Sequence, residues 1–287
     1  MSSPTPLIQN VSDTARWVAF YRAMESERPD AIFHDPFARR LAGEQGEAIV
    51  QSMPRGRAMA WPMIVRTAVM DEIILRVIAQ EGVDCVLNLA AGLDARPWRL
   101  PLPASLLWMD VDMPVMLDHK EAVLQGEHPK CRYEGIRLDL SDAEGRRKLF
   151  HGVADRAQRI LVITEGLLVY LTPEAVAGLA QDLHEETNFA LWLTDLASPA
   201  LLKMLAKNWG HRLAAGNAPM RFAPAEGTRF FERYGWYERE YRATFEESIR
   251  LNRSMKGARF WMLIGKLYPK KKREEFKRFS GIVLMDR

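Results

Sequence analysis

The chain lacks several residue patterns that mark specialised classes of protein. It has two cysteines among 287 residues, Cys85 and Cys131. Each lies in a predicted strand, where cysteine acts as a small buried apolar residue more often than as a disulfide partner. The six histidines and two cysteines show no His-x-x-x-His or Cys-x-x-Cys spacing, so we predict no metal site.

Long apolar runs and an excess of one charge are also missing. No run approaches the roughly 20 apolar residues of a membrane-spanning helix, and the N-terminus shows no secretory signal, so we expect a cytoplasmic protein without membrane contact. The net charge is +3, and the one dense basic run, Lys270 to Arg273, is followed at once by Glu274 and Glu275. This pattern is typical of a solvated helical face, and we expect no nucleic-acid partner.

What is present fits one large α/β domain, since 48% of the residues are hydrophobic and 27% are charged. Strand-like and helix-like segments alternate from Val83 onward, as in a doubly wound, Rossmann-like, mostly parallel sheet. Strands are expected near residues 85–89, 105–109, 133–138, 159–164, 189–194 and 279–285, and helices over 12–27, 61–82 and 114–124, from 142, from 172 and after 198. We expect a single domain over residues 1–287: an N-terminal helical cap (1–82), a cofactor-binding core (83–197), a lid (198–258) and C-terminal strands that complete the sheet (259–287).

The turn after the first expected strand predicts a ligand site. Cys85 to Leu89 is a short apolar run that breaks into Ala90, Ala91 and Gly92, where a ligand could lie against bare backbone. An ordinary tight connection is the alternative. The Gly-x-Gly-x-x-Gly spacing of dinucleotide sites is missing, and Asp94 is a poor neighbour for a phosphate but a good one for a cation. This favours S-adenosylmethionine over NAD.

Acids recur where later strands end. Asp110 and Asp112 follow the second strand, where a carboxylate accepts hydrogen bonds from ribose hydroxyls or caps the next helix. Asp139, after the third strand, either borders an adenine or caps a helix. Glu165 lies between two apolar runs and must face a cation or a donor. Arg66 lies in an apolar helical stretch and requires a carboxylate, from the protein or from the cofactor.

Three ordered motifs, with two matches near the N-terminus, resemble the leucine carboxyl methyltransferase family of class I S-adenosylmethionine-dependent methyltransferases. The motifs are Asn88 to Arg96 with Trp98 to Leu100, Asp110 to Pro114, and Thr164 to Leu171; Arg22 to Glu25 and Phe33 to Ala38 are similar to the bacterial branch that contains O-methyltransferases of polyketide biosynthesis. The resemblance implies a seven-stranded sheet and spans Thr14 to Thr172, with a looser match near Gly235 and Trp236.

By this resemblance, Arg66 together with Arg22 holds the cofactor carboxylate, and the turn from Ala90 through Ala91 to Gly92 faces the methionine portion of the cofactor. Asp112 takes the ribose, Asp139 and Leu140 border the adenine, and Glu165 meets the amino-acid part. The family usually has glycine where Ala90 stands, which puts direct backbone contact there in doubt.

We therefore predict an O-methyltransferase acting on a carboxylate or hydroxyl of a small, polyketide-type molecule by direct displacement, as a monomer or homodimer. Glu165 and Tyr170 are positioning candidates, and no residue is an obvious catalyst. A hydroxyl acceptor would need a base, for which the candidates are His34, His151 and His211. Apolar residues of the expected lid suit an apolar substrate, although they can equally be core: Met204, Trp209, Phe222, Phe230 and Trp236. The alternatives are a protein C-terminal carboxyl methyltransferase, a non-catalytic cofactor-binding protein and an NAD(P) oxidoreductase.

Overall fold

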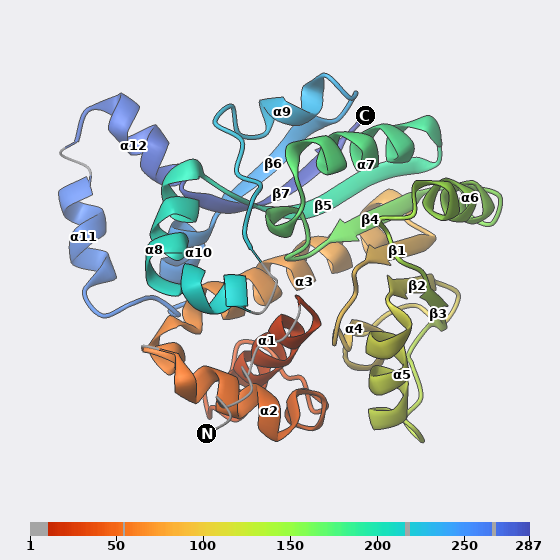
Figure 1. Ribbon diagram of the computed structural model, residues 1–287, viewed down its shortest axis with the longest axis horizontal. Coiled ribbons are helices and arrows are strands. Elements are labelled where there is room, and N and C mark those ends of the chain that lie inside the picture. The colour runs from red at the N-terminus through yellow and green to blue at the C-terminus, as the bar shows by residue number, and fades with distance from the viewer. Residues whose placement is uncertain (1–10, 54, 216–218, 266–267) are drawn as a thin grey trace.

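Seven strands form a sheet in the order β3-β2-β1-β4-β5-β7-β6 (Figure 1). The computed structural model describes residues 11–53, 55–215, 219–265 and 268–287. The strands are β1 (Cys85–Leu89), β2 (Leu107–Asp112), β3 (Arg132–Arg137), β4 (Ile160–Thr164), β5 (Phe189–Ala197), β6 (Tyr237–Ala243) and β7 (Ser280–Asp286). Neighbours from β3 to β5 are parallel, and β7 runs antiparallel to β5 and β6. The predicted mostly parallel, seven-stranded, Rossmann-like sheet is confirmed.

Helices bury both faces of this sheet, as a parallel sheet requires. Strand β1 illustrates the arrangement, because Leu87 and Leu89 point into a core with α6 (Ala143–Ala154) and α7 (Pro173–Glu185). Val86 points into a second core with α3 (Trp61–Glu81). Asp142 caps α6 and Thr172 caps α7 by accepting hydrogen bonds from backbone N–H groups.

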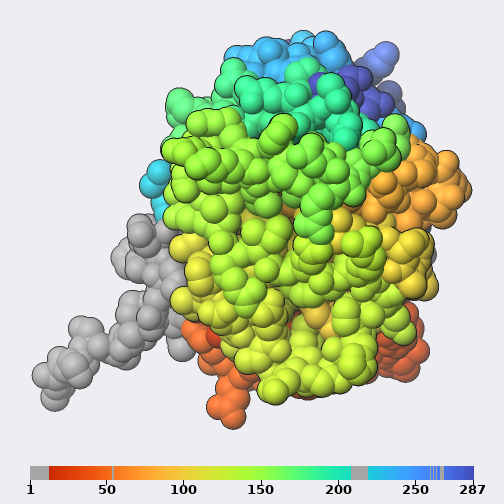
Figure 2. Space-filling view, turned by 90° about the vertical axis from the view of Figure 1, so that its right-hand side faces the viewer, coloured from red at the N-terminus to blue at the C-terminus, as the bar shows by residue number. Residues whose placement is uncertain are grey.

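The N-terminal segment packs as a helical cap below the sheet in Figure 1. It consists of α1 (Val11–Ser26), α2 (Ala38–Ser52), the short 3-10 helix η1 (Gly56–Met59) and the start of α3. A third apolar core joins α1 and α2 to α4 (Arg96–Arg99) and α5 (Pro114–Val123). Figure 2 shows the face on which the chain from α5 to α7 occupies the centre, with the cap below and the C-terminal strands above. The sequence predicted α1 and α3 but missed α2.

The C-terminal third differs from the expectation in two ways. The segment expected as a lid contains edge strand β6, and the segment expected as strands contains two helices before β7. The elements here are α8 (Pro199–Ala215), α9 (Arg229–Glu232), α10 (Thr244–Arg250), α11 (Ala258–Gly265) and α12 (Lys270–Lys277). Helix α12 buries no residue, so the prediction of a solvated helical face is confirmed.

The aromatic residues of the expected lid are largely core residues. Phe222, Phe230 and Trp236 are at most 6% exposed. Trp236 packs edge-on against Trp192 of β5 with ring centroids 5.4 Å apart, and its Nε1 donates to the Ala180 carbonyl of α7. Phe230 and Trp236 stabilise the core beside the sheet and do not line the cavity at the strand ends, so using them as evidence for an apolar substrate was wrong. Phe222, although buried, and Met204 do line that cavity. The Trp209 side chain lies outside the described residues.

Within the described part of the chain, no helix combines the length and apolar character needed to cross a membrane. Cys85 and Cys131 are both buried and free, as predicted.

Candidate active site

A large cavity of about 1820 Å³ opens where the parallel strands end. Its wall includes the turn after β1, the last residue of β2, the loop after β3, Glu165 after β4 and Asp195 near the end of β5. The order of the strands reverses between β1 and β4, and open α/β sheets bind their ligands at such a point. The cap and the C-terminal helices supply the remaining walls. The sheet therefore brings the predicted strand-end residues to one place.

The turn after β1 is held in an unusual backbone conformation. Ala90 has a φ of 54° and Gly92 a φ of 53°, the left-handed region that suits glycine and strains alanine. The Ala91 N–H donates to the Val111 carbonyl at 3.2 Å, and the Gly92 N–H donates to Asp112 Oδ2 at 2.6 Å. All three turn residues line the cavity. The left-handed conformation at position 90 therefore suits the glycine that the family usually has there, and this chain adopts the same conformation with an alanine.

The two acids of β2 have different surroundings. Asp112 lines the cavity and, within the described part of the chain, accepts hydrogen bonds only from the backbone, from Gly92 and from Met113 at 2.7 Å. Burial raises its pKa, although those N–H groups oppose the shift. Asp110 is fully buried and is not part of the cavity wall. It forms an ion pair with Lys120 of α5, itself fully buried, and accepts from Asn88 Nδ2 at 3.0 Å and Trp108 Nε1 at 2.9 Å. The prediction of Asp110 as a cofactor ligand is wrong, because structural donors occupy this carboxylate.

Asp139 and Leu140 lie on the cavity wall after β3. Asp139 is exposed and its Oδ1 accepts from the Ser141 N–H at 2.8 Å, which lowers its pKa. Because Asp142 caps α6, Asp139 is not the helix cap that the sequence left open. The Leu140 carbonyl accepts from Arg146 Nη1 at 2.7 Å.

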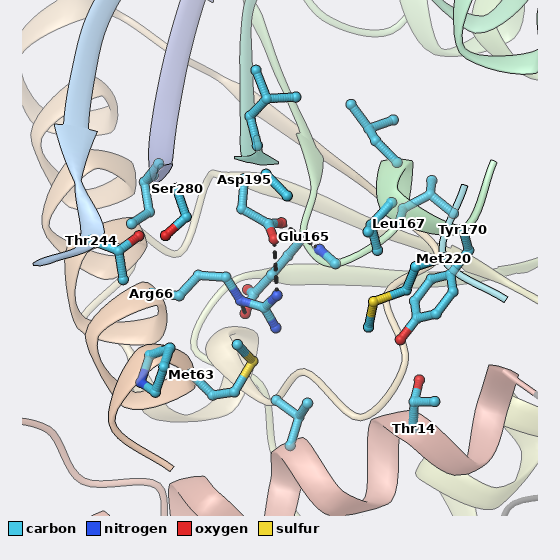
Figure 3. Close-up of a pocket in the computed structure, with 18 of the residues that line it drawn as sticks. Thr14, Met63, Arg66, Glu165, Leu167, Tyr170, Asp195, Met220, Thr244 and Ser280 are labelled. Atoms are coloured by element: carbon cyan, nitrogen blue, oxygen red, sulfur yellow. Dashed lines mark hydrogen bonds and ion pairs between the residues drawn. The ribbon is translucent and has the colours of Figure 1, made fainter. Parts of the chain in front are cut away.

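Arg66 joins α3 to the ends of β4 and β5 (Figure 3). Its Nε donates to Glu165 Oε1 at 3.0 Å and its Nη1 to Asp195 Oδ2 at 3.1 Å. The two carboxylates raise its pKa even though burial lowers it. Asp195 also accepts from the Gly166 N–H at 2.6 Å. The sequence left open whether Arg66 pairs with a carboxylate of the protein or of the cofactor. The structure shows pairs with two protein carboxylates, and the guanidinium also lines the cavity.

Glu165 is bound on its other side by Arg96, whose Nη1 donates to Oε2 at 2.7 Å. Burial opposes its ionisation, but Arg96 and Arg66 outweigh burial and hold the pKa of Glu165 below its ordinary value. The same Nη1 donates to Asp94 at 2.7 Å. The pKa of Asp94 is likewise lowered by Arg96 against the effect of burial. Both predicted acids therefore stay ionised beside the cavity.

These contacts form a continuous series of ion pairs from α1 to β5. Each neighbouring pair lies within 3.8 Å. The series contains four arginines and five carboxylates: Arg22, Arg66, Arg96, Arg99, Asp35, Asp71, Asp94, Glu165 and Asp195. We call this set the ion-pair series. Arg22 belongs to it through Asp35 Oδ2 at 2.8 Å, while its Nη2 donates to the Leu93 carbonyl at 2.5 Å.

The charges on the cavity wall show whether the residues fit S-adenosylmethionine, which carries a sulfonium and an ammonium. Three arginines and three carboxylates of the ion-pair series line the cavity and balance in charge: Arg22, Arg66, Arg96, Asp94, Glu165 and Asp195. Asp112 and Asp139 also line the cavity and accept hydrogen bonds from backbone N–H groups, with no cationic partner among the described residues, so they give the wall its surplus negative charge. A wall with surplus negative charge suits a sulfonium and an ammonium and repels a pyrophosphate. The small residues of the turn after β1 and the strand-end acid Asp112 complete such a site. The residues fit the cofactor.

The remaining candidates lie differently. Tyr170, in the 3-10 helix η2 (Leu168–Tyr170), lines the cavity, and its hydroxyl points toward Thr14 (Figure 3). Burial raises the pKa of Tyr170, so its phenol is neutral near pH 7. His34 is exposed and His151 pairs with Glu186 at the surface, and neither lines the cavity. The side chain of His211 lies outside the described residues.

Sequence reasoning missed Asp195, Arg96 and Asp71. Asp195 follows the apolar run Leu191 to Leu193, so the strand-end argument used for Glu165 would have found it. Arg96 ends the motif Asn88 to Arg96, but its partner Asp71 lies 25 residues earlier in α3, and only the fold brings the two side chains together. Among the described residues, no group of three His, Cys, Asp or Glu side chains is placed to hold a metal ion.

Comparison with known proteins agrees with this geometry. A crystal structure of a DUF574 family protein from Streptomyces avermitilis superimposes with a TM-score of 0.60 at 14% identity, over 96% of this chain and 97% of that chain. A structure named "putative methyltransferase" from Thermobifida fusca gives 0.56 at 16% identity, over 98% and 96% of the two chains. The fold is that of the class I methyltransferases.

Sequence comparison then narrows the class. The family profile described as leucine carboxyl methyltransferase matches residues 15–184, more than half of the chain. The chain belongs to the leucine carboxyl methyltransferase family.

Several relatives carry the name "Putative S-adenosyl-L-methionine-dependent methyltransferase". One from Parafrankia is 37% identical over 60% of this chain and 58% of its own length, and one from Saccharopolyspora erythraea is 32% identical over 71% and 76%. The matches cover 58%, 64% and 62% of the lengths of the first three relatives, so the chain aligns with about three fifths of those proteins.

Proposed function

We propose that the protein is an S-adenosylmethionine-dependent O-methyltransferase that esterifies a carboxylate of an apolar small molecule, such as a polyketide-type metabolite. The observation that carries the proposal is the acidic cavity at the carboxyl ends of β1 to β5, beside the strained turn after β1. Its surplus of carboxylates over guanidiniums favours a cationic cofactor. Two buried free cysteines support a reducing compartment such as the cytoplasm.

The positions of the wall residues support the following assignment of cofactor contacts. Asp112 is the candidate for the ribose, since it faces the cavity with no cationic partner among the described residues. Asp139 and Leu140 are the candidates for the adenine. They lie in the loop after β3, and β3 is the neighbour of β2, which carries Asp112. Arg66 and Arg22 are already paired with carboxylates, so each would reach a cofactor carboxylate only with its remaining N–H donors.

When bound, the cofactor would supply a methyl group on a sulfonium: an O–C bond from the acceptor oxygen to the methyl carbon would form as the C–S bond breaks, and S-adenosylhomocysteine would leave as a neutral thioether. The chain has to align that oxygen and exclude water. Glu165 stays ionised between two arginines and Tyr170 stays neutral, so Glu165 is committed to ion pairs and Tyr170 is suited to positioning. A carboxylic acid, with an ordinary pKa of about 4, needs no base to become a nucleophile, which supports a carboxylate over a hydroxyl acceptor.

A transfer assay with methyl-labelled cofactor and a panel of apolar carboxylic acids and phenols tests the proposal. We expect a labelled product that mild alkali hydrolyses, as it does a methyl ester, and unchanged turnover in excess EDTA. The Asp112→Ala variant serves as the binding-deficient control. An alkali-stable product would identify an ether and a hydroxyl acceptor, and activity restored only by magnesium would contradict the proposed mechanism.

Binding measurements separate the rival functions. Tighter binding of NADPH than of S-adenosylmethionine would indicate an oxidoreductase. Cofactor binding without transfer to any small acid, with transfer to a peptide ending in a free carboxylate, would indicate a protein carboxyl methyltransferase. Binding with no transfer to either would indicate a non-catalytic protein.

A further inference from the structure

Methionine is concentrated in the wall of the cavity. The chain has fourteen methionines, and nine of them are among the described residues that line the cavity. They are Met53, Met59, Met63, Met113, Met116, Met204, Met220, Met255 and Met262. Among the described residues, the only methionines in the two cores on the faces of the sheet are Met109, Met285 and Met70. The cap core contains Met53 and Met116, and Met63 and Met220 pack against it, so methionine gathers where the cap meets the cavity.

Seven of the nine lie outside the turn after β1 and the strand ends, and of these Met63 is one helical turn from Arg66. Met113 and Met116 adjoin Asp112 and belong to the cofactor side. The cap supplies Met53, Met59 and Met63, and the C-terminal third supplies Met204, Met220, Met255 and Met262. Figure 3 shows Met63 and Met220 on different sides of the guanidinium of Arg66. We call these seven residues the methionine wall; it consists of two groups, one from each end of the chain.

The cavity also exceeds what one ligand needs. Sites for a drug-sized ligand measure roughly 300–1,000 Å³, and this cavity measures about 1820 Å³. Met204 and Met255 are 39% and 47% exposed, so the wall extends from the centre of the cavity to its opening. The volume leaves room for a large acceptor beside a cofactor.

Methionine side chains adapt to what they contact. The thioether is unbranched, polarizable and carries three rotatable bonds, so it fills irregular gaps and packs well on aromatic rings. Surfaces rich in methionine repack around different partners. A wall of branched aliphatic residues would instead select one shape.

We propose that the methionine wall is the acceptor site and that it accepts bulky apolar carboxylic acids of different shapes, both linear and polycyclic. This inference rests on the proposed function and names its class of acceptor. It predicts that specificity arises from apolar volume and from the position of the carboxylate and not from one rigid outline.

Methyl-labelled methionine provides a readout that does not depend on turnover. Decanoate and 2-naphthoate are added separately to the full chain saturated with S-adenosylhomocysteine, and single Met→Leu variants assign the resonances. Both acids should shift the resonances of the methionine wall and compete with one another, while those of Met70, Met109 and Met285, outside the cavity, stay in place. Failure of both acids to shift the wall, or response to one shape alone, overturns the inference.

Turnover provides the second test. Met63→Leu and Met220→Leu keep the volume but stiffen the side chain, and Met24→Leu, in the cap core outside the cavity, is the matched control. With either wall variant we expect the ratio of kcat/KM for the two acids to change by about tenfold, the scale of one misplaced methylene, with no change in cofactor Kd. An unchanged ratio overturns the inference. If both acids shift the wall but neither is methylated, the proposed function fails and the binding site stands.

Discussion

At Ala90 the backbone has a φ of 54°, a conformation that costs an alanine roughly 1–2 kcal/mol. The neighbouring residues fix it, because Ala91 is bonded to β2 and Gly92 is bonded to Asp112. Strain of this kind is commonly stored at functional sites. The methyl group of Ala90 therefore lies on the cavity wall at the expense of stability.

We expect Ala90→Gly to be neutral or stabilising, since relief of strain offsets the flexibility of glycine in the unfolded chain. Ala91→Gly is the matched control, because Ala91 has no positive φ and should lose roughly 0.5–1 kcal/mol. Denaturant unfolding of both variants measures the difference. Equal losses would show that the conformation at position 90 carries no strain.

The acids of β2 lead to different phenotypes. Asp112→Ala should weaken S-adenosylmethionine binding by about 1.5–3 kcal/mol, the range for a hydrogen bond to a charged group. It also leaves the Gly92 and Met113 N–H groups without their acceptor, which should cost about 1–3 kcal/mol of unfolding free energy. Asp110→Ala should cost about 3–5 kcal/mol of unfolding free energy, because it leaves the buried Lys120 charge unpaired.

Calorimetry and thermal unfolding on the two variants separate these effects. An Asp112 variant with full affinity, together with a folded Asp110 variant that has lost cofactor binding, would reverse the assignment. The sequence could predict Asp112 from its strand-end position. It could not distinguish Asp110, because the partner Lys120 lies on a different element and its approach depends on how α5 packs.

At the scale of elements, Arg66 and Glu165 connect α3, β4 and β5. The neighbouring arginines hold the pKa of Glu165 below its ordinary value of 4.5, against the effect of burial. The ionised side chain therefore contributes stability that is fully present above pH 4.5 and is lost as the pH falls through the lower folded-state pKa.

Glu165→Gln should lower the unfolding free energy by about 3 kcal/mol near neutral pH, as expected for a broken buried pair. The difference from wild type should shrink as the pH falls below 4.5. Glu144→Gln is the control, since Glu144 pairs with Lys148 in solvent and should cost less than about 0.5 kcal/mol. Unfolding curves between pH 3 and 7 measure both, and a difference independent of pH would contradict the role of the ionised form.

Elements with strong apolar patterns were predictable and those without were not. The apolar run Cys85 to Leu89 predicts strand β1. Pro62 in the first turn and Gly82 after the last turn predict the two ends of helix α3. Edge strand β6 has the sequence Tyr-Glu-Arg-Glu-Tyr-Arg-Ala, whose charges form ion pairs with α3, with α10 and with Arg278 only in the folded chain. Helix α2 contains Gly43 at a φ of 59°, which interrupts the helix, so its pattern is broken in the sequence as well.

At the scale of the whole molecule, the cap and the core share the ion-pair series. Arg22 in α1 and Asp195 in β5 are its two ends, and Asp71 in its middle accepts from Arg96 at 2.6 Å and from Arg99 at 2.7 Å without lining the cavity. The fold-level prediction of a cap was correct, but the sequence could not show that the cap is joined to the sheet by buried charges, because the pairs join residues as far apart as Arg66 and Asp195.

This connection predicts that the cap and the core unfold as one unit and respond together to ligand. S-adenosylhomocysteine at about one hundred times its Kd should raise the unfolding free energy by about 2.7 kcal/mol. If the ion-pair series couples the cap to the core, the slowest-exchanging amides of α1 and of β4 exchange their hydrogens through the same global unfolding reaction. Ligand binding makes that reaction less favourable, so both sets of amides should gain about a hundredfold protection. In Asp71→Asn, which breaks the series in its middle, α1 should lose most of that gain while β4 retains it. Equal gains in α1 for the wild type and the variant would show that apolar packing alone joins the cap to the core.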